Sequence, residues 1–363
     1  MSRYEALRNR LADVDARGLR RTLHPLAMTG PVTARHRGEP VIVFSSNDYL
    51  GLAQHPEMQA AWQGRGAGSS RLIAGDRAAH HALESALSER FGRPATLFNT
   101  GYMANLALVT GLVGRGDRVA SDALNHASII DGIRLSGAER TILEHGRAPE
   151  DPCTLAVVEG LYSMDGDVLA LDTYGGDHWL AVDEAHAVGA LGPDGRGEAA
   201  RQGVEPDFVV GTLGKAYGAF GAFVIGPPEL RELFVSRGRS FVYTTALPEP
   251  VAAAALVGLR LADDERRERL AARTTRFRRG LAELGLPALG SAHIVPLVLG
   301  ERTMRIAAEL LARGFFALGI RPPTVPAGTE RIRFSLSAEH TDEQIDRLLE
   351  ALDACHSLER VSR

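Results

Sequence analysis

Short, continuously apolar runs recur from Val41 onward and constrain the fold of this chain more than any other feature. A run without polar alternation is typical of a strand buried on both faces. Helical patterns such as Ala78–Phe91 and Met103–Val113 separate several of the runs. This alternation predicts an α/β architecture with a mostly parallel central sheet flanked by helices. The runs are Val41–Phe44, Thr96–Phe98, Arg118–Ala120, Leu155–Val158, Trp179–Val182, Phe208–Val210 and Ala222–Ile225.

The length and the change of residue pattern along the chain predict two domains preceded by an N-terminal segment. The chain has 363 residues, which corresponds to about two domains at roughly 150 residues each. We expect residues 1–40 to form a polar helix and an arm, and residues 41–245 to form the large domain. After these, alanine- and arginine-rich helical patterns precede short strands and predict a smaller α+β domain over residues 246–363. Apolar and polar residues alternate in Arg331–Ser337, so we expect that strand to have one exposed face.

Composition disfavours several functional classes. The formal net charge of -4 and the pI of about 6.3 suggest no nucleic-acid-binding surface. Cys153 and Cys355 have no metal-ligand spacing around them, so neither a disulfide scaffold nor a metal site is expected. The sequence shows no signal peptide at Met1–Glu5 and no apolar run of roughly 18 residues. We therefore expect a cytoplasmic protein that binds neither nucleic acid nor membranes.

The chain contains a single lysine, Lys215, among 41 basic residues, and the remainder are arginine. Arginine serves as well as lysine in solvated ion pairs, but its pKa above about 12 prevents it from acting as a neutral amine. The retained lysine is therefore either needed for chemistry or left by chance in an arginine-rich composition. Composition alone leaves both interpretations open.

Polar residues follow the predicted strands at the point where each strand ends. The carboxyl ends of parallel strands meet at one edge of a sheet, so these residues are expected to lie close together. The turn at Gly101 precedes a helix, whose free N–H groups form an anion site. Taken alone, Asp183 could cap a helix, and His126 or His186 could be structural. The set comprises Gly101, Tyr102, His126, Ser163, Asp183, His186, Thr212 and Lys215.

Together these residues fit the needs of pyridoxal 5'-phosphate (PLP). This cofactor requires an amine for its aldehyde, a carboxylate for its pyridinium nitrogen and donors for its phosphate. Lys215, Asp183 and the turn at Gly101 offer these groups. A lysine with the ordinary pKa of about 10.4 is charged and inert, so the site must lower that pKa by desolvation.

Two motifs favour other classes when they are considered alone. Asp183–His186 spells the helicase box D-E-A-H, but the phosphate loop G-x-x-x-x-G-K-[ST] is missing around Lys215, where alanine follows the lysine. Gly64–Gly68 is glycine-rich like a dinucleotide-binding turn, yet no strand precedes it. A non-catalytic or nucleotide-binding α/β protein remains an alternative from a different functional class.

Five motifs make the chain similar to one enzyme family. They are S-S-N-D-Y-L-G-L at Ser45–Leu52, H-A-S-I-I-D-G at His126–Gly132, S-M-D-G-D at Ser163–Asp167, V-D-E-A-H at Val182–His186 and T-L-G-K-A at Thr212–Ala216. With them the chain resembles, nearly end to end, the α-oxoamine synthases, which are PLP-dependent acyltransferases of fold type I. The connections Trp62–Ser70 and Asp172–Trp179 are shorter than is usual in that family.

The resemblance implies roles at the cofactor. Lys215 forms the internal aldimine and later moves the α-proton. Asp183 pairs with the pyridinium nitrogen, His186 hydrogen-bonds the phenolic oxygen, and His126 stacks on the ring. Further cofactor contacts are implied at Gly101, Tyr102, Ser163, Thr212, Thr244 and Thr245, the last two in a segment that reaches the phosphate from the partner subunit of a homodimer.

The implied reaction is a decarboxylative condensation of an amino acid with an acyl thioester. Arg321 is expected to hold the amino-acid carboxylate, and substrate contacts are also implied at Arg20, Asn47, His126 and Thr324. The segment Arg321–Thr329 favours family members that join L-alanine to a pimeloyl thioester in biotin synthesis. Members that use glycine are the alternative. Coenzyme A and acyl carrier protein both remain open as carriers of the acyl group.

Overall fold

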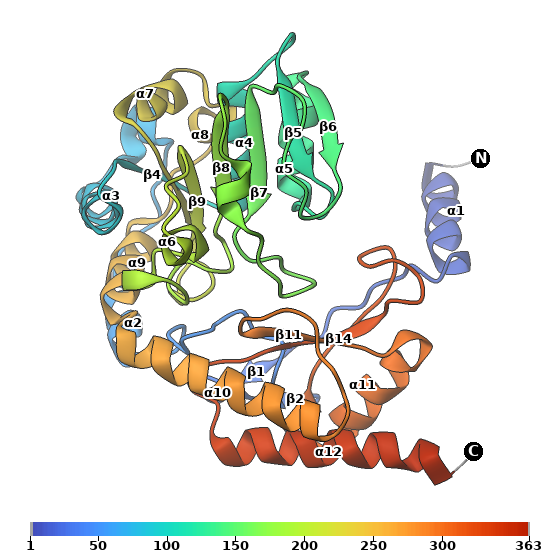
Figure 1. The fold of residues 1–363 in the computed structure, drawn as a ribbon. Helices are drawn as coiled ribbons and strands as arrows, with labels where there is room; N and C mark the ends of the chain where they lie inside the picture. Colours follow the sequence, from blue (N-terminus) through green and yellow to red (C-terminus); the bar gives the residue numbers. More distant parts are fainter. Residues whose placement is uncertain (1–2, 362–363) are drawn as a thin grey trace.

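A seven-stranded sheet forms the upper lobe of the computed structural model, which describes residues 3–361 and side chains up to residue 356 (Figure 1). The strand order is β4-β10-β9-β8-β7-β5-β6, and β10 runs antiparallel to both of its neighbours. The other strands run parallel to one another, which confirms the predicted mostly parallel sheet. The strands are β4 (Ala95–Phe98), β5 (Arg118–Asp122), β6 (Glu139–Leu143), β7 (Leu155–Glu159), β8 (Trp179–Asp183), β9 (Phe208–Thr212) and β10 (Ala222–Ile225).

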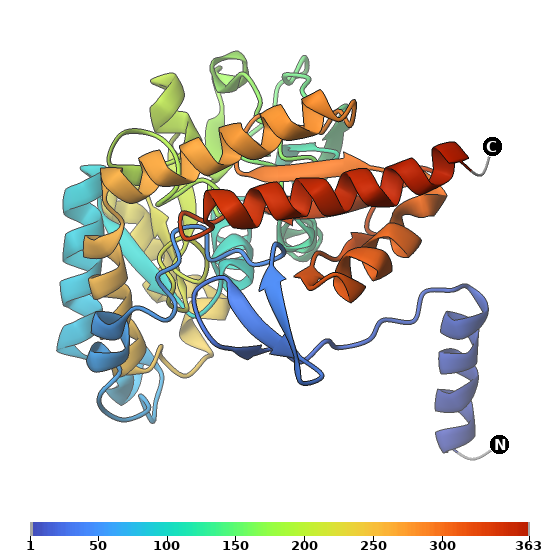
Figure 2. The same ribbon diagram turned by 90° about the horizontal axis from the view of Figure 1, so that it is seen from below.

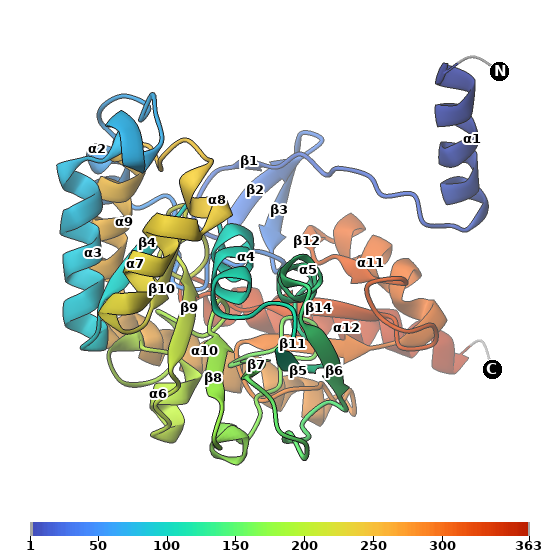
Figure 3. The same cartoon turned by 90° about the horizontal axis from the view of Figure 1, so that it is seen from above.

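Helices bury this sheet and explain why its strands are continuously apolar. Helices α4 and α5 pack side by side, and α4 also contacts α7, α8 and the strands β9 and β10 (Figure 3). Helix α3 packs on β4 and on α9. All five residues of β7 and of β9 are buried as a result. The helices are α3 (Ala78–Phe91), α4 (Gly101–Leu112), α5 (Ala127–Ser136), α6 (Glu198–Gln202), α7 (Pro228–Arg237), α8 (Arg239–Val242) and α9 (Glu249–Leu261).

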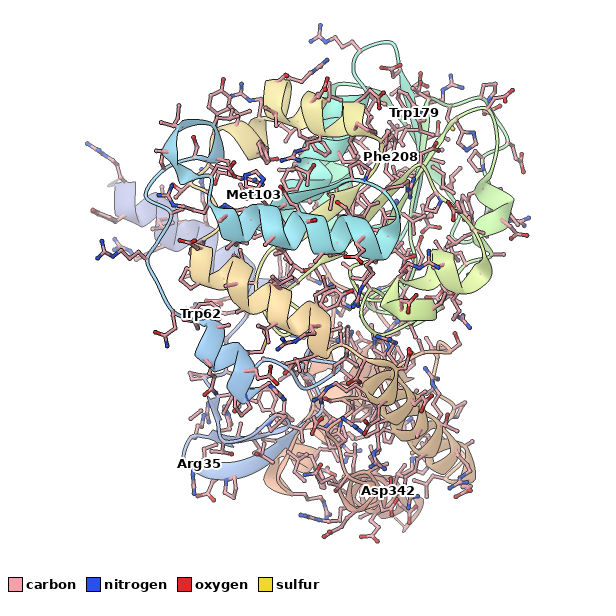
Figure 4. All side chains as sticks on the ribbon, turned by 90° about the vertical axis from the view of Figure 1, so that its left-hand side faces the viewer. Arg35, Trp62, Met103, Trp179, Phe208 and Asp342 are labelled. Carbon is pink, nitrogen blue, oxygen red and sulfur yellow. The ribbon has the colours of Figure 1, made fainter. Side chains whose placement is uncertain are left out.

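The C-terminal residues form most of the lower lobe, in which long helices underlie a small antiparallel sheet (Figures 1 and 2). That sheet has the order β11-β14-β13. In Figure 4, the labels Arg35 and Asp342 lie in this lobe, and the labels Trp179 and Phe208 lie in the upper lobe. The ring centroids of Trp179 and Phe208 are 6.1 Å apart. The elements are α10 (Asp264–Glu283), β11 (Ile294–Val298), α11 (Thr303–Ala312), β13 (Gly319–Ile320), β14 (Arg331–Ser335) and α12 (Asp342–Val361).

The apolar run Val41–Phe44 does not join the large sheet, contrary to the sequence-based expectation. Strand β3 (Glu39–Val43) lies in a second small sheet with β1 (Ala27–Met28), β2 (Thr33–His36) and β12 (Phe315–Phe316). Its partner β12 belongs to the lower lobe and runs parallel to it. An apolar run indicates burial but not which sheet buries it.

Strand β14 has no exposed face, and this sequence-based expectation is also wrong. Its polar side chains Arg331, Arg333 and Ser335 are buried as fully as the apolar ones between them. The two guanidinium groups cross to the loop Ser163–Asp165 of the upper lobe and hydrogen-bond there. Alternation correctly predicted two faces of different chemistry, but the polar face meets another part of the protein instead of water.

The remaining segments connect the lobes or extend from them. Helix α1 (Arg3–Ala16) buries none of its residues and stands apart from the body of the chain (Figure 2). Among the described residues, no helix is long and apolar enough to cross a bilayer. Short helical pieces complete the fold, namely α2 (Pro56–Ala61), a π-turn at Arg71–Gly75, and 3-10 turns at Leu171–Tyr174, Pro193–Gly195 and Gly300–Arg302.

Phe277 on α10 tests the core of the lower lobe. Its fully buried ring lies with its centroid 5.1 Å from that of Phe334 and 6.5 Å from that of Phe44. Phe277→Ala should lower the free energy of unfolding by about 3–5 kcal/mol, because a large cavity remains. Urea denaturation followed by circular dichroism measures this loss. Leu135→Ala, at a residue 69% exposed, is the control and should stay within about 0.5 kcal/mol of the parent.

Candidate active site

The carboxyl ends of the parallel strands bring most of the predicted site residues to one edge of the large sheet, which faces the lower lobe (Figure 1). Asp183 ends β8 and pairs in register with Glu159 at the end of β7. Thr212 ends β9, and Lys215 follows it in the next turn. The topology thus places an amine beside two carboxyl groups, as the strand pattern predicted for Lys215 and Asp183.

Lys215 has the lowered amine pKa that covalent chemistry requires. Burial lowers the pKa of its ammonium from 10.5 to about 8. The nearby charges of Asp183 and Glu159 oppose this shift, and the positive charge of Arg333 adds to it. A substantial fraction of the amine is therefore neutral near physiological pH, when it acts as a nucleophile or as a base.

The carboxylate of Asp183 is buried and held at both oxygens. Its Oδ1 accepts the backbone N–H of Ala185 at 3.0 Å, and its Oδ2 accepts from Asn105 Nδ2 at 2.7 Å. A carboxylate oxygen has more than one lone pair, so both oxygens retain capacity for a further donor. This fixed, buried acceptor suits a charged N–H partner.

His126 is the N-cap of α5, and its imidazole is held by Ser128 in the first turn of that helix. Its Nδ1 lies 2.7 Å from Ser128 Oγ and accepts the backbone N–H of Ser128 at 3.3 Å. The carboxyl group of Glu159 accepts the backbone N–H of His126. The edge of the Tyr102 ring faces the His126 ring, with centroids 6.3 Å apart. The residue itself is exposed, so a ligand can reach the imidazole.

His186 is buried and neutral. Its pKa lies well below the ordinary value because burial disfavours the cation, and the charges of Lys215 and Arg333 add to the effect. Its Nδ1 hydrogen-bonds Tyr49 Oη at 2.6 Å. Tyr49 in turn donates to Asn47 Oδ1 at 3.1 Å. The predicted substrate residue Asn47 and the predicted cofactor residue His186 are therefore joined by a tyrosine that sequence analysis did not single out.

The N-terminus of α4 provides an open anion cradle. Thr100 caps this helix by accepting the N–H of Met103, which leaves the N–H groups of Gly101 and Tyr102 free for a ligand. A Cβ atom built on Gly101 would meet no heavy atom within 4 Å, so the space in front of the turn is empty.

The other predicted phosphate contacts lie close to neighbouring strand ends. Thr212 Oγ1 donates to the carbonyl oxygen of Gly221 at 3.1 Å and accepts the N–H of Gly214. Asn99 Nδ2, one residue before the α4 cap, donates to Thr244 Oγ1 at 3.3 Å and to the carbonyl oxygen of Thr245 at 2.8 Å. Thr244 and Thr245 are therefore tied to the β4 end of the same chain, and their contact with a partner subunit stays a prediction.

Arg333 lies in the candidate site, and sequence analysis did not single it out. Its guanidinium donates to the carbonyl oxygen of Ser163, to Asn47 Oδ1 at 3.2 Å and to Ser335 Oγ at 2.8 Å. Its charge also lowers the pKa of Lys215. The available signal was the arginine on the polar face of an alternating strand, which we interpreted as solvated.

Arg321, Thr324 and Arg20 form a separate cluster with the N-terminal arm. The Arg321 guanidinium donates to the carbonyl oxygens of Gly18 and Arg20, and Arg21 Nη2 donates to Thr324 Oγ1 at 3.0 Å. The Arg20 guanidinium pairs with Asp15 at 2.8 Å. These three predicted substrate residues are brought together, but the hydrogen bonds and ion pairs of their side chains lead to the N-terminal arm and not to Lys215, Asp183 or His126.

The fold and site define a PLP-type transferase, and the chain belongs to the aminotransferase class I and II family, whose model matches residues 39–352. An 8-amino-7-oxononanoate synthase from Methylococcus capsulatus is 49% identical over 345 residues, which cover 87% of this chain and 89% of that protein. A serine palmitoyltransferase variant from S. paucimobilis, solved with a PLP–myriocin aldimine, aligns with a TM-score of 0.89 and 32% identity over 99% of this chain and 98% of that one. An 8-amino-7-oxononanoate synthase structure from Francisella tularensis aligns with a TM-score of 0.78 and 29% identity over 88% of this chain and 99% of that one.

These similarities confirm the predicted fold class, that of the fold type I PLP-dependent transferases. The residues present also fit PLP on structural grounds. Lys215 supplies an amine of lowered pKa, Asp183 a buried acceptor, and Gly101 and Tyr102 free N–H groups before an empty space. The exposed face of His126 offers a surface for a flat ring.

The pKa of Lys215 can be measured without ambiguity, because the chain has one lysine. In the PLP-free protein, acylation of Lys215 should rise with pH around a midpoint near 8, whereas an exposed lysine gives about 10.4. The neutral amine reacts, so its fraction grows as pH passes through the folded pKa. Mass spectrometry of the Lys215 peptide, separate from the N-terminal peptide, gives the profile. A midpoint above 10 would contradict desolvation of this amine.

Proposed function

We propose that this protein is a PLP-dependent acyltransferase that condenses L-alanine with a pimeloyl thioester. The products are 8-amino-7-oxononanoate, carbon dioxide and the free thiol. The observation that carries the proposal is the environment of Lys215, the one lysine of the chain, which has a lowered pKa and senses the charges of Asp183 and Arg333. The similarity to an 8-amino-7-oxononanoate synthase at 49% identity supports the choice of substrates.

The side chains of this site perform distinct tasks in such a reaction. When bound, PLP supplies an aldehyde and a ring that accepts the electron pair released at the amino-acid α-carbon. In its neutral form, which the lowered pKa makes more abundant, Lys215 Nζ would take the α-proton as a general base. Asp183 would accept the N–H of the ring nitrogen and so favour its positive charge. His126 would pack against the ring plane, and His186 would lie at the phenolic oxygen.

The amino-acid carboxylate is assigned to Arg333 in place of the expected Arg321. Arg333 reaches Asn47 and Ser163, and its charge acts on Lys215. Arg321 hydrogen-bonds the N-terminal arm instead. A planar guanidinium binds a carboxylate through two parallel hydrogen bonds, which a lysine does not reproduce. Charge-assisted pairing beside the base would orient the α-carbon for proton removal.

A homodimer that shares its active sites belongs to the proposal. Ile73 and Tyr243 are large apolar side chains with exposures of 81% and 75%. They lie in segments joined by the bond from Ala246 N–H to the carbonyl oxygen of Ser69, next to Thr244 and Thr245. Exposed apolar groups of this size favour coverage by a partner, here a second copy of the chain.

The reaction itself tests the proposal. The PLP-loaded protein should form a product with the mass of 8-amino-7-oxononanoate from L-alanine and pimeloyl-coenzyme A, together with equal amounts of carbon dioxide and free thiol. Pimeloyl-acyl carrier protein is tested in parallel, because the two carriers are separate sources of the same acyl group. Glycine and L-serine serve as competing amino acids. A faster reaction with glycine would overturn the assignment of L-alanine.

Asp183→Asn separates cofactor binding from chemistry. The amide keeps the size of the side chain and can still accept from Asn105, so we expect PLP to bind and its visible band to persist. Turnover should fall on the order of 100-fold or more, because the ring nitrogen loses its negatively charged partner. Near-normal turnover in this variant would rule out the role of Asp183. Asp172→Asn, in a surface turn, is the matched control.

Arg333→Lys and Arg321→Lys form a matched pair that decides which arginine holds the carboxylate. Arg333→Lys should raise KM for L-alanine about 10- to 100-fold, the range for losing a hydrogen bond between charged groups. Arg321→Lys should change KM by less than about threefold, because its guanidinium bonds neutral carbonyl groups. Steady-state kinetics at saturating thioester gives both values. The opposite order would restore Arg321 as the carboxylate ligand.

A further inference from the structure

A chain of buried polar side chains connects Asp183 to His126 through two residues outside the predicted site. Asn105 Nδ2, on α4, donates to Asp183 Oδ2 at 2.7 Å and to Ser128 Oγ at 3.0 Å. Ser128 Oγ lies 2.7 Å from His126 Nδ1. The exposures of Asn105 and Ser128 are 2% and 0%. Water therefore does not replace these hydrogen bonds when one of them is lost.

The direction of each hydrogen bond follows from the charged end of the chain. A carboxylate only accepts, so the Asn105 atom that faces Asp183 is the amide nitrogen. The second hydrogen of that nitrogen points to Ser128 Oγ, which accepts it and directs its own hydrogen to His126 Nδ1. The backbone N–H of Ser128 points to the same ring nitrogen. Nδ1 is therefore an acceptor, and the neutral ring of His126 carries its proton on Nε2.

We infer that Asn105 and Ser128 are positioning residues, which orient the Asp183 carboxylate and fix the Nε2–H tautomer of His126 through one shared amide. The inference rests on the proposed function, in which Asp183 and His126 meet the cofactor. Because Nδ1 accepts from Ser128, the other ring nitrogen, Nε2, is a hydrogen-bond donor. On this exposed residue such a donor would suit an oxygen of the substrate, such as a carboxylate or a thioester carbonyl.

Substitution of each positioning residue should affect a different part of the hydrogen-bonded chain between Asp183 and His126. The pattern of binding constants therefore distinguishes a positioning role from a general loss of stability. Ser128→Ala removes the hydroxyl that reaches His126 but leaves the bond between Asn105 and Asp183. Asn105→Leu has a similar volume and removes both. We therefore expect Ser128→Ala to alter substrate binding alone, and Asn105→Leu to weaken the binding of PLP as well.

A double-mutant cycle between Ser128 and His126 measures this connection. In the PLP-loaded protein, the change of the visible band gives the apparent Kd for L-alanine, and titration of the PLP-free protein gives the Kd for PLP. Ser128→Ala should raise the first about five- to tenfold and change the second less than about threefold, as for one neutral hydrogen bond. In a His126→Ala background, Ser128→Ala should have no further effect. Asn105→Leu should raise the Kd for PLP about tenfold.

Thr110→Val is the control on the same helix, because the Thr110 hydroxyl bonds only within α4, to the carbonyl oxygen of Leu106 at 2.6 Å. It should leave both constants unchanged. Additive effects of Ser128→Ala and His126→Ala would overturn the inference, as would an equal loss of PLP affinity in Ser128→Ala and Asn105→Leu. A wild-type protein that binds PLP but does not respond to L-alanine would contradict the proposed function instead.

The tautomer can be observed directly in the wild-type chain, and a variant is needed only to assign the signal. Nitrogen-15 NMR of the histidine-labelled, PLP-free protein distinguishes the two neutral forms of the ring, and the signal lost in His126→Ala identifies the residue. We expect Nε2 to carry the proton. A His126 signal with the proton on Nδ1 would overturn the inference whatever substrate the protein uses.

Discussion

The guanidinium groups of β14 form hydrogen bonds between the two lobes, and the geometry of the site depends on these bonds. Arg333 donates to the carbonyl oxygen of Ser163 in the upper lobe and to Asn47 and Ser335 in the lower one. Arg331 reaches Met164 and Asp165 in the same upper loop. A buried cation without partners would cost roughly several kcal/mol. These bonds therefore set how far apart the lobes lie, and they also place two positive charges between the lobes.

Where the two lobes meet, hydrogen-bond partners and burial determine the charge of a titratable side chain more than its residue type does. His145 lies between Asp122 and Asp167, at 2.9 Å and 2.7 Å, and their hydrogen bonds raise its pKa to about 10. His293 is more deeply buried than the half-buried His145 and lacks an acidic partner, and burial lowers its pKa to about 3. The imidazolium of His145 thus ties the end of β5 to the loop that carries Ser163. Burial likewise lowers the pKa of Lys215 and so makes its neutral amine available.

The sequence predicted what depends on local pattern and missed what depends on lobe packing. Continuous apolar runs and strand ends placed Lys215, Asp183, Thr212 and Gly101 at one edge, because parallel strands share their direction. Pairing of β3 with β12 could not be predicted, since burial does not specify a neighbour. Arg333 was hidden for a related reason: a polar residue on an alternating strand has the same pattern whether water or another lobe covers it.

The register of a single strand pair carries a consequence for how this protein can fail. In the β11–β14 pair, Arg333 lies opposite Pro296 and Phe334 opposite Val295, so the guanidinium groups and the core residues occupy opposite faces. Because side chains alternate, a slip of one residue would send both arginines into the hydrophobic core and the core residues Ile332 and Phe334 into the site. A molecule with this one-residue slip could not keep a sound interior around a damaged site. For this error, correct packing of the lower lobe and competence of the active site are lost together, and quality control that recognises exposed core residues would also remove the inactive molecules.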